Sequence, residues 1–195
     1  MTDVPESPPS WLKLTEELKR DTAHIDAATS HESDRGVALT MAAFFDLTLA
    51  KLLRARFASA KQSQLIEPLF GAFGPLSTFS AKIRISYAID LLQEWMALDL
   101  NLVRQIRNEF AHSLEPKTFS DPIIDKLVNR MKGYEKAQER TERLGGKRSA
   151  PTNPPNSWKF RLSSAAMGAL LQAKIVVLNT DAPAEFKAHF MVADL

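Results

Sequence analysis

Apolar residues recur three and four positions apart along most of this 195-residue chain. That spacing is typical of helices that bury one side, because an α-helix completes a turn every 3.6 residues. No two alternating apolar and polar segments are joined by a hairpin turn, so no strand is required. The pattern predicts an all-α, single-domain bundle of about seven helices over residues 10–180, with tails at residues 1–9 and 181–195. The helices are expected near residues 10–25, 33–57, 62–70, 78–92, 99–112, 122–143 and 157–179. The second of them can begin at Ser30 or Ser33, and Thr78 is expected to cap the fourth.

The segment that ends near Phe57 is apolar on more than half of its circumference. A helix of this kind is usually surrounded by other helices, so we expect it at the centre of the bundle. Its apolar positions are Val37, Leu39, Met41, Phe44, Phe45, Leu47, Leu49, Leu52 and Leu53.

The segment 99–112 has two different sides. At 100° per residue, Asp99, Leu102, Val103, Ile106 and Phe110 fall on one side of a helix. Ile106 and Phe110 are therefore expected in the core, and Asp99 is expected to cap the start of this helix. The other side forms a candidate functional polar face, made of Arg104, Arg107, Asn108 and His112.

A series of short motifs surrounds this segment. Glu-Pro-Leu lies at 67–69, Gly-Pro-Leu at 74–76 and Ser-x-Lys-Ile at 80–83; Tyr87, an Asp-Leu pair, Ile-Arg-Asn-x-Phe-Ala-His at 106–112 and Phe-x-Asp at 119–121 follow. In this order they resemble the mannitol-operon repressor family over roughly residues 35–130. The resemblance implies an all-helical bacterial transcriptional regulator. The family has no recognised DNA-reading motif and no established catalytic residues.

The amino-acid composition and the net charge exclude several kinds of function for this chain. Hydrophobic residues make up 45% and charged residues 25%, and the net charge of +2 creates no field that favours nucleic acid. Cysteine is absent, which excludes disulfides and thiol catalysis, and the four histidines are scattered. We expect no metal and no cofactor. The start does not resemble a signal peptide, and no apolar run approaches the length needed to span a bilayer, so we expect a cytoplasmic protein without membrane association.

Arg107 and His112 also fit the Arg-x4-His pattern of HEPN-type ribonucleases, which are helical bundles too. In that hypothesis His112 is a general acid or base and Arg107 neutralises phosphate. The structural alternative pairs Arg107 with an acidic neighbour, while Asn108 and His112 tie the helix end to a loop. We favour the structural interpretation, since a histidine near a helix C-terminus is stabilised by the helix dipole.

Two features suggest DNA binding. The turn at Gly71–Pro75 precedes a helix that could present Ser77, Thr78, Ser80, Lys82 and Arg84 to bases. Against this, Phe79, Ile83, Tyr87, Leu91 and Leu92 would form the inner face of the same helix. The second feature is a basic stretch at 126–148, with a candidate basic surface made of Lys126, Arg130, Lys132, Lys136, Arg140 and Arg143.

Charges of both signs along the basic stretch favour a solvated face instead. The sequence therefore predicts a non-enzymatic regulator that acts through a protein partner. Direct DNA binding through the basic stretch, the ribonuclease activity and self-association remain alternatives.

Overall fold

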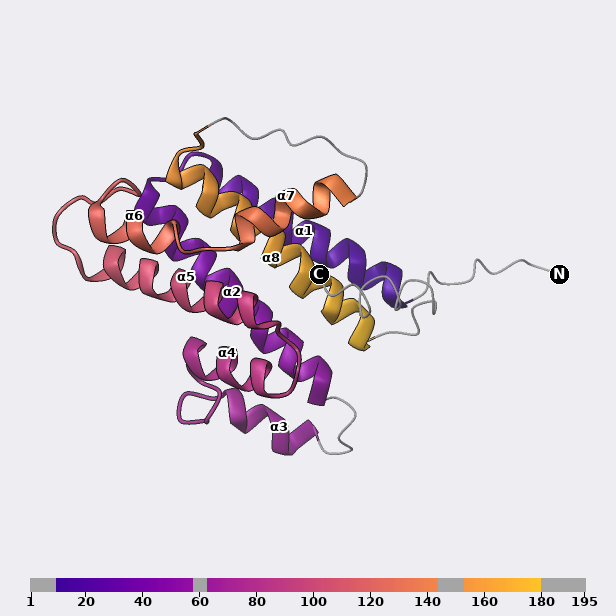
Figure 1. Ribbon diagram of the computed structural model, residues 1–195. Coiled ribbons are helices and arrows are strands. Elements are labelled where there is room, and N and C mark those ends of the chain that lie inside the picture. The colour runs from indigo at the N-terminus through magenta and orange to yellow at the C-terminus, as the bar shows by residue number, and fades with distance from the viewer. Residues whose placement is uncertain (1–9, 58–62, 144–152, 180–195) are drawn as a thin grey trace.

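The computed structural model describes residues 10–57, 63–143 and 153–179, which form eight helices and no strand. The helices are α1 (Ser10–Ser30), α2 (Asp34–Phe57), α3 (Ser63–Phe70), α4 (Phe79–Ala88), α5 (Glu94–His112), α6 (Pro122–Val128), α7 (Gly133–Arg143) and α8 (Asn156–Asn179). Figure 1 shows α1, α7 and α8 on one side of α2, and α3 and α4 on the other. The predicted all-α class is confirmed.

The helix α2 lies at the centre, as its apolar pattern predicted. It packs against α1, α3, α4, α5 and α8. Phe45, Leu49, Leu52 and Leu53 are completely buried, because neighbouring helices cover α2 on several sides. Leu47 is the exception among the predicted positions, since 65% of its surface is exposed.

The helix α5 begins at Glu94 with Gln93 as its N-cap, so the prediction that Asp99 starts this helix is wrong. The apolar side was predicted correctly: Ile106 and Phe110 are buried. The ring of Phe110 meets Phe119 with 5.3 Å between centroids, and Phe119 meets Phe160 of α8 at 4.9 Å. Aromatic contacts therefore join α5 to α8 through the loop that precedes α6.

Residues 122–143 form two helices, although the sequence predicted one. The helix α6 ends at Val128, and α7 begins at Gly133. The carboxylate of Asp99 accepts hydrogen bonds from the backbone N–H groups of Lys132 (3.0 Å) and Gly133 (2.7 Å). Asp99 thus caps the start of α7 from another helix, a long-range contact that local periodicity cannot reveal.

The turn between α3 and α4 is tight. The Leu76 N–H donates to the Leu69 carbonyl at 2.8 Å, and the Leu76 side chain is buried. A Cβ at Gly74 would overlap the carbonyl oxygens of Pro68 and Leu69, so only glycine fits there. These residues form a helical corner anchored by the buried Leu76, and the corner places the start of α4 against α2.

The helix α4 is capped by Thr78, as predicted; its hydroxyl accepts a backbone N–H of the first turn at 3.2 Å. Ile83 is buried, which confirms its predicted inward position. Leu91 and Leu92 are also buried, but they follow the end of α4. Tyr87 is 48% exposed, so its predicted place on the inner face is wrong.

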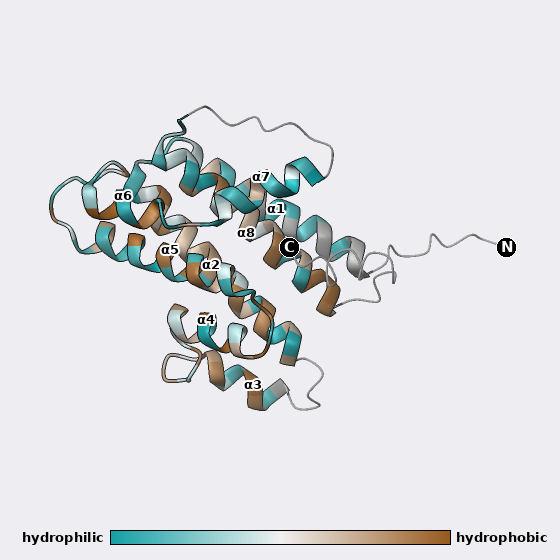
Figure 2. Cartoon of the chain, viewed as in Figure 1, coloured by the Kyte–Doolittle hydropathy of each residue, from teal (hydrophilic) through white to brown (hydrophobic). Residues whose placement is uncertain are grey.

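Two helices, α2 and α8, are long and apolar enough to cross a membrane by length and composition alone. This differs from the expectation that no run approaches that length. In each case 56% of the apolar window is buried inside the protein, and the two helices pack against each other. In Figure 2, α2 and α8 carry brown segments, whereas α7 is mostly teal. Their hydropathy is what two core helices require.

Candidate functional site

A groove of about 590 Å³ opens where the start of α4 meets α2 and α5. We call it the polar groove. Three of the four residues of the predicted polar face, Arg104, Arg107 and Asn108, line it from α5. The remaining lining residues are Leu39, Ala42, Ala43 and Asp46 of α2, with Ser77, Thr78, Phe79 and Ser80 around the start of α4. The groove is built by segments that are distant in sequence and joined by the helical corner.

Arg104 contributes an unsatisfied donor to the polar groove. Its Nε is shielded from solvent and has no hydrogen-bond partner in the described part of the chain. A desolvated donor without an acceptor is costly, more so when it belongs to a charged group. An acceptor supplied from outside the chain would remove that cost.

Arg107 lies one turn further along α5 and is exposed. Its Nη1 donates a hydrogen bond to the Asn108 Oδ1 at 3.0 Å. Among the described residues Arg107 forms no ion pair, so the structure gives no support to the hypothesis that it pairs with an acidic neighbour. A guanidinium has five N–H donors, so this single bond leaves Arg107 able to bind a further acceptor.

The carboxylate of Asp46, which lines the polar groove, forms an ion pair with a lysine. Lys82 of α4 is buried, and its Nζ lies 2.6 Å from the Asp46 Oδ1. This ion pair fastens α4 to α2 and neutralises Asp46. The guanidinium groups of Arg104 and Arg107 consequently give the polar groove a net positive charge, which favours anionic groups.

His112 does not join the other three residues of the predicted polar face. It is exposed at the last position of α5 and does not line the polar groove. The end of α5 is instead held by Arg35, whose guanidinium donates to the carbonyls of Ala111 (3.5 Å) and Ser113 (3.3 Å). A cation at a helix C-terminus is favourable, but here α2 supplies it.

The ribonuclease hypothesis needs Arg107 and His112 to act on one phosphate. The structure places Arg107 on the polar groove and His112 outside it. His112 lines neither the polar groove nor the cavities of about 450 Å³ and about 140 Å³ elsewhere in the bundle, so the arrangement gives that chemistry no support.

The helix-turn-helix hypothesis needs α4 to present its side chains to bases. Lys82 and Ser86 are buried, and Lys82 is committed to Asp46. Arg84 is exposed, but the hydroxyl of Thr78 is used as the cap of α4. A helix held in this way cannot enter a major groove with Lys82 at its reading face.

The candidate basic surface is divided between two elements. Lys126, Arg130 and Lys132 are exposed on α6 and the turn after it, whereas the other three residues lie on α7. Lys136 pairs with Glu139 at 2.9 Å. Lys136, Arg140 and Arg143 also border a small cavity of about 140 Å³ beside Trp95. The basic residues do not form the single helix that the sequence predicted.

Asp99 is the buried carboxyl of α5, 1% exposed. Burial raises the pKa of Asp99, and the hydrogen bonds from the Lys132 and Gly133 backbone partly oppose that shift. A Cβ at Gly133 would lie 3.1 Å from Asp99 Oδ2 and 3.0 Å from Ser163 Cβ, so the close approach favours glycine. The position links α5, α7 and α8 and has a structural role.

The described residues form a helical bundle with the polar groove, and they contain no group of three or more His, Asp or Glu side chains that could hold a metal ion. The family described as "Mannitol repressor" matches residues 12–153 of the chain. The chain therefore belongs to the mannitol repressor family and is a regulator by that membership. No curated protein matches its sequence.

Two solved structures share the fold. One is the MtlR–HPr complex from Escherichia coli, in which the matched chain is 15% identical, with a TM-score of 0.54 over 82% of this chain and 98% of that one. The other is YggD from Shigella flexneri, described as a possible transcriptional regulator, which is 14% identical, with a TM-score of 0.53 over 88% of this chain and 99% of that one. At these identities, the similarity concerns the fold.

Proposed function

We propose that this chain is a cytoplasmic transcription regulator that acts by binding a protein partner, and that the polar groove receives an acidic side chain of that partner. The observation that carries the proposal is the buried Nε of Arg104, which has no acceptor among the described residues. A carboxylate inserted beside Arg104 and Arg107 would accept charge-assisted hydrogen bonds from both. The net positive charge of the groove selects acidic partners over basic ones.

The arrangement of the helices supports a protein partner over direct DNA reading. The core holds α4 through Ile83 and Lys82, and the basic residues are divided between α6 and α7. Lys82 is therefore not available to read base edges, and no single helix carries all six residues of the candidate basic surface.

A relative with the same fold supports the same conclusion, because it was crystallised in a complex with the protein HPr. We infer by analogy that the present chain also binds a protein. We take the genes under its control to be a mannitol operon, as the family description suggests, or the operon of another sugar alcohol.

The test is co-purification from the native host with the full chain as bait, after treatment with nuclease. The wild type should retain a protein that the double variant Arg104→Gln/Arg107→Gln loses by about tenfold or more, which corresponds to about 1.4 kcal/mol. The matched control is Arg84→Gln/Arg130→Gln, which removes the same charge from exposed positions away from the groove. Retention that disappears with nuclease, or that is equal in both double variants, would contradict the proposal.

A further inference from the structure

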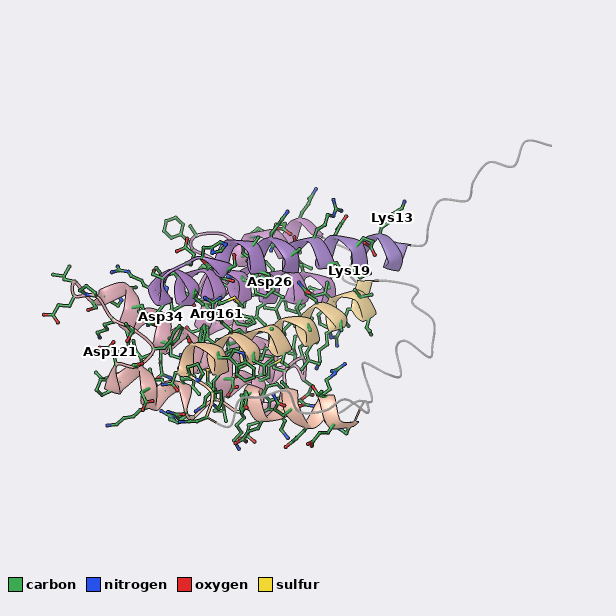
Figure 3. All side chains as sticks on the ribbon, turned by 90° about the horizontal axis from the view of Figure 1, so that it is seen from above. Lys13, Lys19, Asp26, Asp34, Asp121 and Arg161 are labelled. Carbon is green, nitrogen blue, oxygen red and sulfur yellow. The ribbon has the colours of Figure 1, made fainter. Side chains whose placement is uncertain are left out.

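A second cavity lies on the opposite side of α2, where α1 and α8 run side by side. Its volume is about 450 Å³, within the range of about 300–1,000 Å³ typical of small-molecule sites. Figure 3 looks onto this side of the molecule, with Asp26 of α1 and Arg161 of α8 labelled. We call it the α1–α8 cavity. It shares no lining residue with the polar groove.

The walls of the α1–α8 cavity are mostly apolar. Ile25, Met41, Phe44 and Leu162 line it from three helices. Gly168 brings α8 close to α2, since a Cβ there would lie 3.0 Å from the Phe44 ring. Apolar walls favour a ligand with an apolar body.

A fully buried hydroxyl in this wall has no partner among the described residues. Ser164 is 0% exposed, it lines the cavity, and its Oγ makes no hydrogen bond to a described residue. Thr29 provides the contrast: it lines the same cavity, but its hydroxyl donates to the Ile25 carbonyl at 2.8 Å. A buried hydroxyl without a partner carries a desolvation cost, which a ligand acceptor in the cavity would remove.

A cation lies next to that hydroxyl. Arg161 is half-buried, it lines the same cavity, and no ion pair or hydrogen bond joins its guanidinium to the described residues. Arg161 and Ser164 are three positions apart in α8, so they are neighbours on one helix face. A single carboxylate can accept hydrogen bonds from both groups.

We propose that the α1–α8 cavity binds a small amphipathic carboxylate, with its charged end at Arg161 and Ser164 and its apolar body against Ile25, Met41 and Phe44. The ligand chemistry follows from the mixture of apolar walls and two unsatisfied donors. Asp26 also lines the cavity, from the exposed side of α1. Its carboxylate is open to solvent and is screened, whereas Arg161 is half-buried and faces less screening.

The test uses decanoate as the probe, titrated into the full chain by calorimetry, with decanol and decylammonium as analogues of the same length. Decanoate should bind with one-to-one stoichiometry and more tightly than decylammonium. Arg161→Gln should weaken decanoate by at least about tenfold and leave decanol unchanged. Ser164→Ala should weaken decanoate by about threefold, consistent with the loss of one hydrogen bond.

Two further variants make the result specific. Arg130→Gln removes an exposed arginine outside the cavity and should leave decanoate binding unchanged. Ala165→Phe places a ring at an exposed position of the cavity lining and should block both decanoate and decanol. Absence of saturable decanoate binding, equal binding by Arg161→Gln, or tighter binding of decylammonium would overturn the proposal. Because Arg104 and Arg107 lie elsewhere, failure here leaves the proposed function of the polar groove untouched.

Discussion

The two sides of α2 carry different chemistry although the helix itself is apolar on more than half of its circumference. On one side, α4 and α5 add arginines, hydroxyls and an ion pair, and the result is the polar groove. On the other side, α1 and α8 add apolar side chains with only a few polar ones, and the result is the α1–α8 cavity. The character of each site is therefore decided by the neighbours of α2.

Both sites contain a buried donor that no described residue satisfies, the Nε of Arg104 in the groove and the Oγ of Ser164 in the cavity. The buried hydroxyls of Ser86 and Ser163 also lack a partner among the described residues, but they line neither site. Other buried polar groups are paired: Lys82 with Asp46, and Asp99 with two backbone N–H groups. Satisfied groups hold the fold together, whereas unsatisfied groups facing a cavity point to binding.

The largest expected effect comes from a substitution in the hydrophobic core that supports both sites. Phe110→Ala should lower the free energy of unfolding by about 3–5 kcal/mol, because a fully buried aromatic ring is deleted. The control is Phe73→Ala, whose ring is completely exposed and which should cost less than about 0.5 kcal/mol. Denaturant melts measure both. Equal small losses would show that α5 is rotated relative to the core.

The next largest effect is the loss of stability when the ion pair beside the polar groove is broken. Lys82→Met should lower the free energy of unfolding by about 2–4 kcal/mol, because Asp46 would keep its charge without a partner in a largely buried position. The Asp46 side chain is 33% exposed, so the loss should be smaller than for a fully buried ion pair. Lys51→Met removes a pair with Asp21 that has the same 2.6 Å separation but is exposed, and should cost less than about 1 kcal/mol. If the two variants were equally stable, the Lys82–Asp46 pair would not fasten α4.

On the side of the α1–α8 cavity, removal of the unpartnered polar group should barely change the free energy of unfolding. Ser164→Ala should leave the free energy of unfolding within about 0.5 kcal/mol of the wild type or raise it, because a hydroxyl without a partner is removed. Thr48→Val deletes a buried hydroxyl that donates to the Phe44 carbonyl at 2.7 Å, and should cost about 0.5–1.5 kcal/mol. A loss at Ser164 as large as that at Thr48 would mean that its hydroxyl is satisfied in solution.

The smallest expected effect is the pH dependence of the stability that Asp99 contributes. Asp99 lines neither the polar groove nor the α1–α8 cavity. Its pKa is raised in the folded protein, so the folded state binds this proton more readily than the unfolded state does. The stability due to protonation is complete below the ordinary pKa of aspartate and is lost as pH rises through the folded value. The stability of the wild type relative to Asp99→Asn should therefore be greater at pH 4 than at pH 7. Melts that show the reverse trend would mean that the two backbone hydrogen bonds outweigh desolvation.

Local sequence patterns predicted much of the fold. The periodic apolar residues of α2 and α5 and the cap at Thr78 follow from neighbours within a few positions, and the structure confirms them. The division of residues 122–143 into two helices was missed, because it depends on the carboxylate of Asp99 in another helix.

The polar groove and the α1–α8 cavity were harder to predict from the sequence than the fold. Arg104, Arg107 and Asn108 were placed correctly on one polar side, but their groove needs Asp46 and the start of α4, which the corner brings close in space. Arg161 and Ser164 were not predicted at all. Their helix is largely apolar, and nothing local distinguishes a hydroxyl that lacks a partner from one that bonds within its own turn.

The most direct test of the central claim compares the groove with the basic surface in the native host. Deletion strains complemented with each variant are examined by RNA sequencing, for the genes whose transcripts change on deletion. Arg104→Gln/Arg107→Gln should behave like the deletion, because the partner is lost, whereas Lys126→Gln/Arg130→Gln/Lys132→Gln should restore wild-type transcript levels. The opposite result, with regulation lost in the basic-surface variant and kept in the groove variant, would contradict regulation through protein contact and indicate direct DNA binding.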